Sequence, residues 1–213
     1  SGQSETALQS YFGRVNYGFD GKYLLTATLR YDGSSKFLGK NRWGTFPSFA
    51  GAWVISEEGF MQSIKSISLL KLRAGWGRVG NEQSAGAYDY TTSMFGNNIY
   101  VFNDQITQGF APGSLANPEL RWEVNEQSNI GVDVHLLKGK VTLSADYFDR
   151  RTNDMIVSVP IPGYVGAGAP RVNAGSMRNH GIELTAGLHG GNALKYSLGA
   201  NISFIKNELT SLG

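Results

Sequence analysis

The feature that most constrains this chain is a two-residue periodicity that returns along most of its 213 residues. Between positions 23 and 32, apolar side chains occupy the odd positions, and Thr26, Thr28 and Arg30 lie between them. Successive side chains of a strand point to opposite faces, so this alternation predicts a strand with one apolar and one polar face. The same pattern predicts eight strands, at 11–19, 23–32, 46–55, 70–77, 132–136, 141–147, 182–188 and 194–204.

Tight turns predict that neighbouring strands form antiparallel hairpins. A three-residue loop with a central glycine would pair Phe19 with Tyr23, and a short turn at 137–140 would pair Leu136 with Val141. The last hairpin is predicted to turn at 189–192. Between the third and fourth strands, Ser56 and the residues that follow it predict a capped short helix.

Composition supports an all-β chain and excludes several other classes. The chain is 41% hydrophobic and 17% charged, against about 25% charged in an ordinary soluble domain. With 28 glycines, it is a poor candidate for a helical bundle or a disordered tail. It has no cysteine, which excludes disulfides, thiolate zinc sites and cysteine nucleophiles. A net charge of +2 is too small to indicate a nucleic-acid partner.

The connections between strands are predicted to differ at the two ends of the sheet. Short connections fall at 20–22, 56–66, 137–140 and 189–193, whereas long polar segments fall at 33–45, 78–121 and 151–178. Short turns at one end and long loops at the other are typical of outer-membrane β-barrels. The longest uninterrupted stretch of apolar residues and glycine, 49–55, is far shorter than the roughly 20 residues that a membrane helix needs.

Aromatic residues gather at both predicted ends of the strands, as interfacial girdles do in membrane barrels. Glu126 is expected just beyond the apolar band, which is roughly 25 Å tall in such barrels. From the pattern alone, a soluble β-sandwich that buries its apolar stripes face to face stays open as an alternative. The girdle residues are Tyr17, Phe19 and Tyr23 near the short turns, and Tyr11, Tyr31, Trp76 and Tyr147 near the long loops.

Short motifs occur along the chain in a definite order. They include RWGTFPS at 42–48, NPELRWE at 117–123 and RNHGIEL at 178–184, with further matches at 29–37, 53–58, 72–77, 80–81, 147–148, 152–156 and 173–177. In this order and spacing they resemble the barrel of the SusC/RagA family of TonB-dependent outer-membrane transporters of Bacteroidetes-type bacteria. The resemblance covers nearly the whole chain.

The resemblance implies a fold and a function. The fold is all-β, an antiparallel up-and-down transmembrane β-barrel of about 22 strands, of which about eight lie here. Residues 1–213 would be a partial TonB-dependent receptor β-barrel domain, with the plug and the other strands outside the chain. The implied function is nutrient uptake across the cell outer membrane, without enzyme activity. The implied partners are membrane lipid, glycan or peptide substrates, and a SusD-like surface lipoprotein and TonB contacted through other parts of the protein.

The segment 86–110 is the strongest candidate for substrate contact. It carries six aromatic rings among amides and carboxylates, a combination that suits sugar faces or peptide backbones. The alternative is that the rings pack a small core of the loop itself. The predicted substrate-binding residues are Tyr100, Phe102 and Asp104.

Two rival functions follow from the residues alone. A self-contained eight-stranded barrel, acting as an anchor or adhesin, predicts that the strand containing Tyr11 pairs with the strand that ends near Phe204. A barrel enzyme predicts that His135 bonds to a carboxylate and approaches a nucleophile, with Asp133 and Ser144 as its neighbours.

No metal site or cofactor is predicted. The three histidines, His135, His180 and His189, are too scattered to converge on one ion. The glycine-rich stretch 163–169 lacks the lysine and helix of a phosphate loop, and a mobile extracellular loop is the favoured interpretation. The oxygen-bearing residues at 32–35 and 103–104 are too few for calcium.

Overall fold

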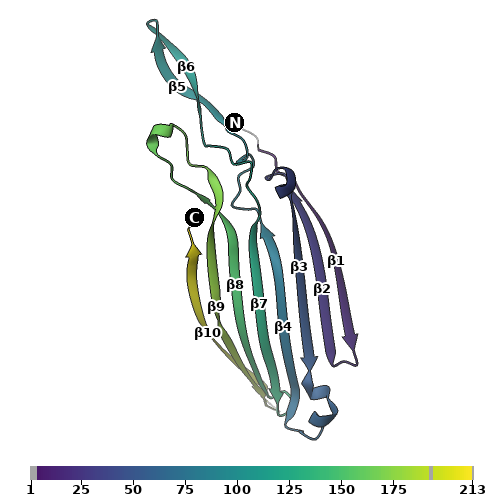
Figure 1. The fold of residues 1–213 in the computed structure, drawn as a ribbon. Helices are drawn as coiled ribbons and strands as arrows, with labels where there is room; N and C mark the ends of the chain where they lie inside the picture. Colours follow the sequence, from purple (N-terminus) through teal and green to yellow (C-terminus); the bar gives the residue numbers. More distant parts are fainter. Residues whose placement is uncertain (1–3, 192–193, 213) are drawn as a thin grey trace.

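The computed structural model describes residues 4–191 and 194–212, and these residues form an open antiparallel sheet with one separate hairpin (Figure 1). The eight-stranded sheet has the order β1-β2-β3-β4-β7-β8-β9-β10, and β5 pairs with β6 alone. The strands are β1 Leu8–Phe19, β2 Tyr23–Ser34, β3 Trp43–Val54, β4 Ile67–Asn81, β5 Met94–Phe102, β6 Gln105–Pro112, β7 Glu123–Leu136, β8 Val141–Ser158, β9 Arg171–Gly190 and β10 Tyr196–Ser211.

Among the residues that the structure describes, helical structure is limited to four short 3₁₀ segments, η1 Gly39–Arg42, η2 Ile55–Glu57, η3 Gly59–Met61 and η4 Gly163–Val165. The capped helix predicted after Ser56 is therefore wrong: two 3₁₀ turns stand there, and neither has a side-chain cap. Glu58 separates them with an extended backbone, and its carboxylate accepts hydrogen bonds from Tyr23 and Trp53 and caps neither turn. No helix in the described ranges has the length and apolar character to span a membrane.

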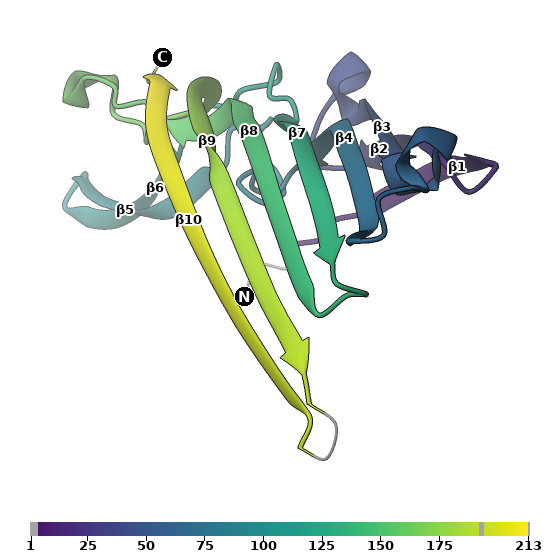
Figure 2. The same ribbon diagram turned by 90° about the horizontal axis from the view of Figure 1, so that it is seen from below.

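The large sheet is a single curved layer, as Figure 2 shows. One of its faces carries large apolar side chains that stay exposed, with Leu25 at 55% and Ile202 at 53%. No second sheet covers this face within the described residues. Burial between two layers is what a soluble sandwich requires, so the structure rules that alternative out.

Strand pairing follows the predicted register where turns are tight. Phe19 lies opposite Tyr23, and Leu136 lies opposite Val141. The last hairpin is longer than predicted, because β9 continues to Gly190, which pairs with Tyr196. Two residues of the predicted connection, 192 and 193, lie outside the described ranges.

At the other end, three predicted loops are shorter than expected. β8 extends to Ser158 and β9 begins at Arg171, which leaves only 159–170 as a connection. β4 likewise continues to Asn81, and β5 and β6 occupy much of 94–112. Hydrophobic alternation ends where side chains leave an apolar environment, but the backbone ladder continues beyond that point. The hydrophobic pattern therefore underestimates the lengths of the strands at this end.

Both edges of the large sheet are unpaired in the part of the chain that the structure describes. β1 pairs with β2 only, and β10 pairs with β9 only. The predicted pairing between the strands of Tyr11 and Phe204 is absent from that region, because the eight strands span an arc rather than a closed ring. The small-barrel alternative is therefore contradicted.

Candidate functional site

The polar face of the sheet carries a connected set of charged side chains. The Arg73 guanidinium donates to both oxygens of Asp133, at 2.8 and 3.0 Å, and to Asp146 at 3.0 Å. The Ser144 hydroxyl lies 3.0 Å from Asp133 and 3.1 Å from Asp146. Gly131 makes room for this cluster, because a Cβ there would lie 2.1 Å from an Asp146 oxygen. The face is thus polar here, with one guanidinium shared between two carboxylates.

His135 does not complete a catalytic arrangement. Its neighbour across the sheet is Thr142, and Asp133 is committed to Arg73 and Ser144. In the ranges the structure describes, the His135 ring bonds to no carboxylate, and the Ser144 hydroxyl meets carboxylates rather than a histidine. The hypothesis of a barrel enzyme is wrong, since a nucleophile needs an adjacent base.

A cavity of about 380 Å³ opens on the same polar face, farther toward the long loops. Its carboxylates, amides and guanidinium come from three adjacent strands, β7, β8 and β9. Such groups can donate to and accept from hydroxyls or peptide groups. The alternating polar positions of the sequence indicated a polar face, but only the strand register shows which of these side chains lie close together. The polar lining residues are Gln127, Asn129, Asp146, Arg150, Asn179 and Glu183.

The predicted substrate residues lie on the β5–β6 hairpin, which stands away from the sheet at its long-loop end (Figure 1). Tyr100 and Phe102 are 51% and 70% exposed and share one face of the hairpin. Tyr100 pairs with Thr107, and Phe102 pairs with Gln105, so amide and hydroxyl groups lie beside the rings. The structure therefore brings Tyr100 and Phe102 together on an accessible surface.

Asp104 has a backbone role in the same hairpin. It forms the two-residue turn with Asn103, and their φ angles are +61° and +55°. Turns of this kind favour Asn, Asp and Gly because both central residues adopt a left-handed conformation. The turn conformation alone therefore explains why an aspartate stands at position 104, and no bound ligand is needed to account for it.

The long-loop end contains a small buried core. Trp122 packs against Phe37 and Phe46, with ring centroids 5.2 and 5.6 Å away, and its indole N–H donates to the Arg42 carbonyl at 3.2 Å. Leu120, Ala85 and Ile156 complete the cluster. The RWGTFPS and NPELRWE motifs therefore meet here, where they fix the loops to the ends of the strands.

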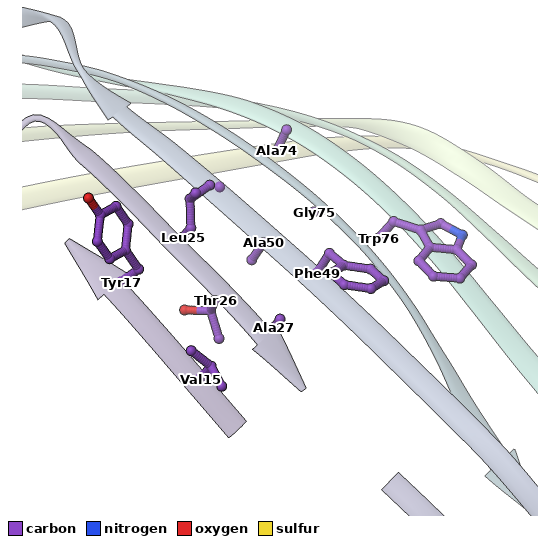
Figure 3. Close-up of a pocket in the computed structure, with 11 residues that line it drawn as sticks. Val15, Tyr17, Leu25, Thr26, Ala27, Phe49, Ala50, Ala74, Gly75 and Trp76 are labelled. Atoms are coloured by element: carbon purple, nitrogen blue, oxygen red, sulfur yellow. The ribbon is translucent and has the colours of Figure 1, made fainter. Parts of the chain in front are cut away.

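The apolar face carries a shallow cavity of about 510 Å³, shown in Figure 3. Phe49 and Trp76 stack with 6.1 Å between their ring centroids, and small residues such as Ala27 and Ala74 leave the hollow beside them. Its lining is almost wholly apolar, which suits acyl chains rather than water-soluble ligands. The described ranges contain no group of three or more potential metal ligands.

Comparison with known proteins gives a consistent result. Residues 1–211 match the family model described as TonB dependent receptor-like, beta-barrel. The chain is 38% identical over 209 residues to TonB-dependent receptor P39 of Formosa agariphila, with 97% of this chain and 20% of that protein covered. It is 37% identical over 220 residues to TonB-dependent receptor SusC of Bacteroides thetaiotaomicron, with 98% and 21% covered.

A solved structure of the RagAB peptide transporter superposes with a TM-score of 0.86 at 31% identity, with 98% of this chain and 23% of that chain covered. The chain therefore spans about a fifth of the length of the curated relatives it matches. Those relatives are receptors and transporters, not enzymes. The chain belongs to the TonB-dependent receptor family, as part of an outer-membrane β-barrel.

Proposed function

We propose that residues 1–213 form a continuous part of the barrel domain of a SusC/RagA-type transporter that imports glycans or peptides across the outer membrane. The observation that carries the proposal is the open, single-layered sheet, with one exposed apolar face and one polar face. An isolated sheet of this kind leaves both its edges and its apolar face unsatisfied. Further strands would continue from β1 and β10, and lipid would cover the apolar face.

The partners of the whole transporter follow from the same proposal. A SusD-like surface lipoprotein would cover the long-loop end, and TonB would supply energy through a plug outside this chain. Support comes from the likeness to SusC and to the RagAB peptide transporter. The segment itself would contribute wall and loops, because its polar cavity and its exposed hairpin offer binding groups and no reactive centre.

Uptake in cells that carry the complete receptor tests this proposal. We expect uptake of labelled short oligosaccharides or short peptides to require both the receptor and TonB, and to stop when a protonophore collapses the energy supply. Equal uptake of unrelated solutes without TonB would mean that the barrel is an open pore, which contradicts the proposal.

Within this function, we propose that Tyr100 and Phe102 stack on the substrate and that Asp104 presents its carboxylate at the turn. Replacing Tyr100 and Phe102 together by alanine should weaken substrate binding by roughly tenfold, because exposed aromatic rings dominate such contacts. The assay is binding of a panel of short oligosaccharides and short peptides to the purified receptor.

The matched control lies on the other face of the same hairpin. Val101 and Ile106 pair with each other there and are as exposed as the aromatic rings. A Val101→Ala/Ile106→Ala variant should bind the panel as the parent receptor does. Equal losses in the two double variants would indicate a general defect of the hairpin and would contradict the assignment to one face.

A further inference from the structure

The apolar face turns into a charged face within one step along the strands. The register aligns outward-facing residues of β4, β7, β8, β9 and β10 in rows across the sheet. An apolar row is formed by Ala74, Ile130, Tyr147, Ile182 and Phe204. The next row toward the long loops is formed by Trp76, Ser128, Asp149, His180 and Lys206. The row after that is formed by Arg78, Glu126, Arg151, Arg178 and Glu208.

These two rows, which we call the charged band, lie at the aromatic girdle and just beyond it on the lipid-facing side. Tyr147 and Trp76 mark the position of the membrane interface, where aromatic rings concentrate in such barrels. Side chains one or two steps farther along the same face meet the head-group layer rather than acyl chains. Because long loops are extracellular in such barrels, this position corresponds to the outer leaflet.

The charged band has a small excess of positive charge. Arg78 pairs with Glu126 at 2.8 Å, and Lys206 pairs with Glu208. Between these pairs, Arg151 and Arg178 both bond to Asp149, at 3.1 and 2.9 Å. The two rows thus hold four cationic side chains and three carboxylates within the described part of the chain, a surplus of one positive charge.

Arg151 and Arg178 stand directly opposite each other in the register of β8 and β9. Like charges in that position repel. Asp149 bonds to both guanidinium groups, and Glu126 and Glu208 lie opposite Arg151 and Arg178 on their other sides. Both side chains reach solvent, with 57% and 33% of their surface exposed. Arg151 donates to Asp149 through Nε, so its two Nη groups have no acceptor in the part of the chain that the structure describes.

An apolar hollow lies on the same face toward the short turns, and its lining begins at Tyr147 and Ile182, four residues along β8 and β9 from the arginine pair. It has a volume of about 260 Å³ and is lined by Ile130, Ala145, Tyr147 and Ile182, among others. Ala145 leaves the space, because its neighbours on the row are larger. A cationic pair above an apolar hollow matches an amphiphile that has an anionic head and an acyl chain.

We propose that Arg151 and Arg178 bind a phosphate group of an outer-leaflet lipid, whose acyl chain lies in the hollow beside Ala145. Guanidinium groups donate two parallel hydrogen bonds to phosphate oxygens, which gives this pair a preference for phosphate over sugar hydroxyls. The inference rests on the proposed membrane placement but not on the transported substrate. A lipid held there would fix the height of the barrel in the membrane.

The test uses the complete receptor in nanodiscs or mild detergent, with lipid A as the probe and dephosphorylated lipid A as the comparison. The parent receptor should prefer the phosphorylated probe. An Arg151→Gln/Arg178→Gln variant should bind it about 30-fold more weakly, the effect expected from two basic residues near a membrane surface. An Arg151→Lys/Arg178→Lys variant keeps the positive charges without the planar guanidinium groups. Its affinity for the phosphorylated probe should lie between those of the parent and the glutamine variant.

The matched control removes two positive charges at the opposite membrane end. Lys65 and Lys140 are exposed near the short turns, so a Lys65→Gln/Lys140→Gln variant should bind the probe as the parent does. Equal affinity for both probes, or an unchanged glutamine variant, would overturn the proposal. Inorganic phosphate that competes as well as lipid A would show a site for free anions and would overturn the lipid assignment.

Uptake measured in the same variants separates this inference from the proposed function. Uptake that persists while lipid selectivity is absent contradicts the lipid site alone. Selective lipid binding in a receptor that does not import contradicts the transport proposal alone.

Discussion

Glu58 joins the two 3₁₀ turns to the neighbouring strands at the short-turn end. One of its carboxylate oxygens accepts from the Tyr23 hydroxyl at 2.7 Å and from the Trp53 indole N–H at 3.0 Å, and the other lies 3.5 Å from the Lys22 ammonium. These donors favour the ionised form. The hydrogen bond from Tyr23, followed by that from Trp53, holds the pKa of Glu58 below its ordinary value of 4.5.

A Glu58→Gln variant should therefore lose stability in a pH-dependent way. A carboxyl group whose pKa is lowered by folding stabilises the folded state above its unfolded pKa, and this contribution fades as the pH falls through the folded value. The difference between parent and variant should be largest near neutral pH and shrink at pH values below about 4.5. Unfolding midpoints of the complete barrel across pH measure it, and a difference that grows in acid would contradict this account.

Gly80 lies where the Phe46 ring passes over the end of β4. A Cβ at this position would lie 2.1 Å from the tip of that ring, so a Gly80→Ala variant must displace Phe46 from the core that it shares with Trp122. We expect a loss of about 1–3 kcal/mol in the free energy of unfolding, the usual cost of overpacking. Gly59, which has open space around its Cβ direction, provides the control, and equal losses for the two alanine variants would contradict the prediction.

Single-residue roles were the part least accessible from the sequence. The predicted pairing of Leu136 with Val141 also sets Asp133 opposite Ser144, as in the structure, because a tight turn fixes the register of the β7–β8 hairpin. Arg73, which binds both Asp133 and Asp146, was missed, since it comes from a strand 60 residues away from Asp133. Contacts between distant strands depend on register, which alternation alone does not determine.

At the scale of elements, the long loops are fixed to the sheet by the buried core around Trp122. A Trp122→Ala variant removes the ring contacts with Phe37 and Phe46 and the hydrogen bond to the Arg42 carbonyl. The loss should be about 3–5 kcal/mol, as for other buried aromatic residues. Because the strands continue below this core, we expect protease cleavage to increase at 33–45 while the barrel stays folded.

Tyr164 supplies a control for this prediction. Its ring is also in a long connection but is 90% exposed, so a Tyr164→Ala variant should leave cleavage at 33–45 unchanged. Limited proteolysis with mass spectrometry of the fragments distinguishes the two variants. Unchanged protection in the Trp122 variant would mean that the core does not hold the loops.

Element type was predictable wherever lipid and water enforce alternation, and less so elsewhere. The strands that cross the predicted membrane band were found with their turns, because one face must be apolar over its whole height. The upper parts of β8 and β9 fall in the predicted loop 151–178, because polar and apolar residues are mixed there without a sustained alternation. The hairpin of β5 and β6 was not predicted either, although Asn103 and Asp104 form a favourable turn.

At the scale of the whole molecule, the account depends on the different surroundings of the two faces of the sheet. The structure places Leu184 and Ala186 of β9 on the apolar face and Glu183 and Thr185 on the polar face. The eight strands form an open arc, so the two faces acquire an outside and an inside only when further strands complete the barrel. The overall architecture could be predicted from a resemblance across the chain, whereas alternation alone also allowed a sandwich.

The most direct test introduces single cysteines at positions 183 to 186 of the complete receptor in membranes, since this segment has no cysteine of its own. A water-soluble maleimide should label cysteines at positions 183 and 185, while lipids that carry a quencher should quench a fluorophore attached at 184 and 186. Labelling and quenching that do not alternate along β9, or that alternate in the opposite phase, would contradict the assignment of lipid to the apolar face.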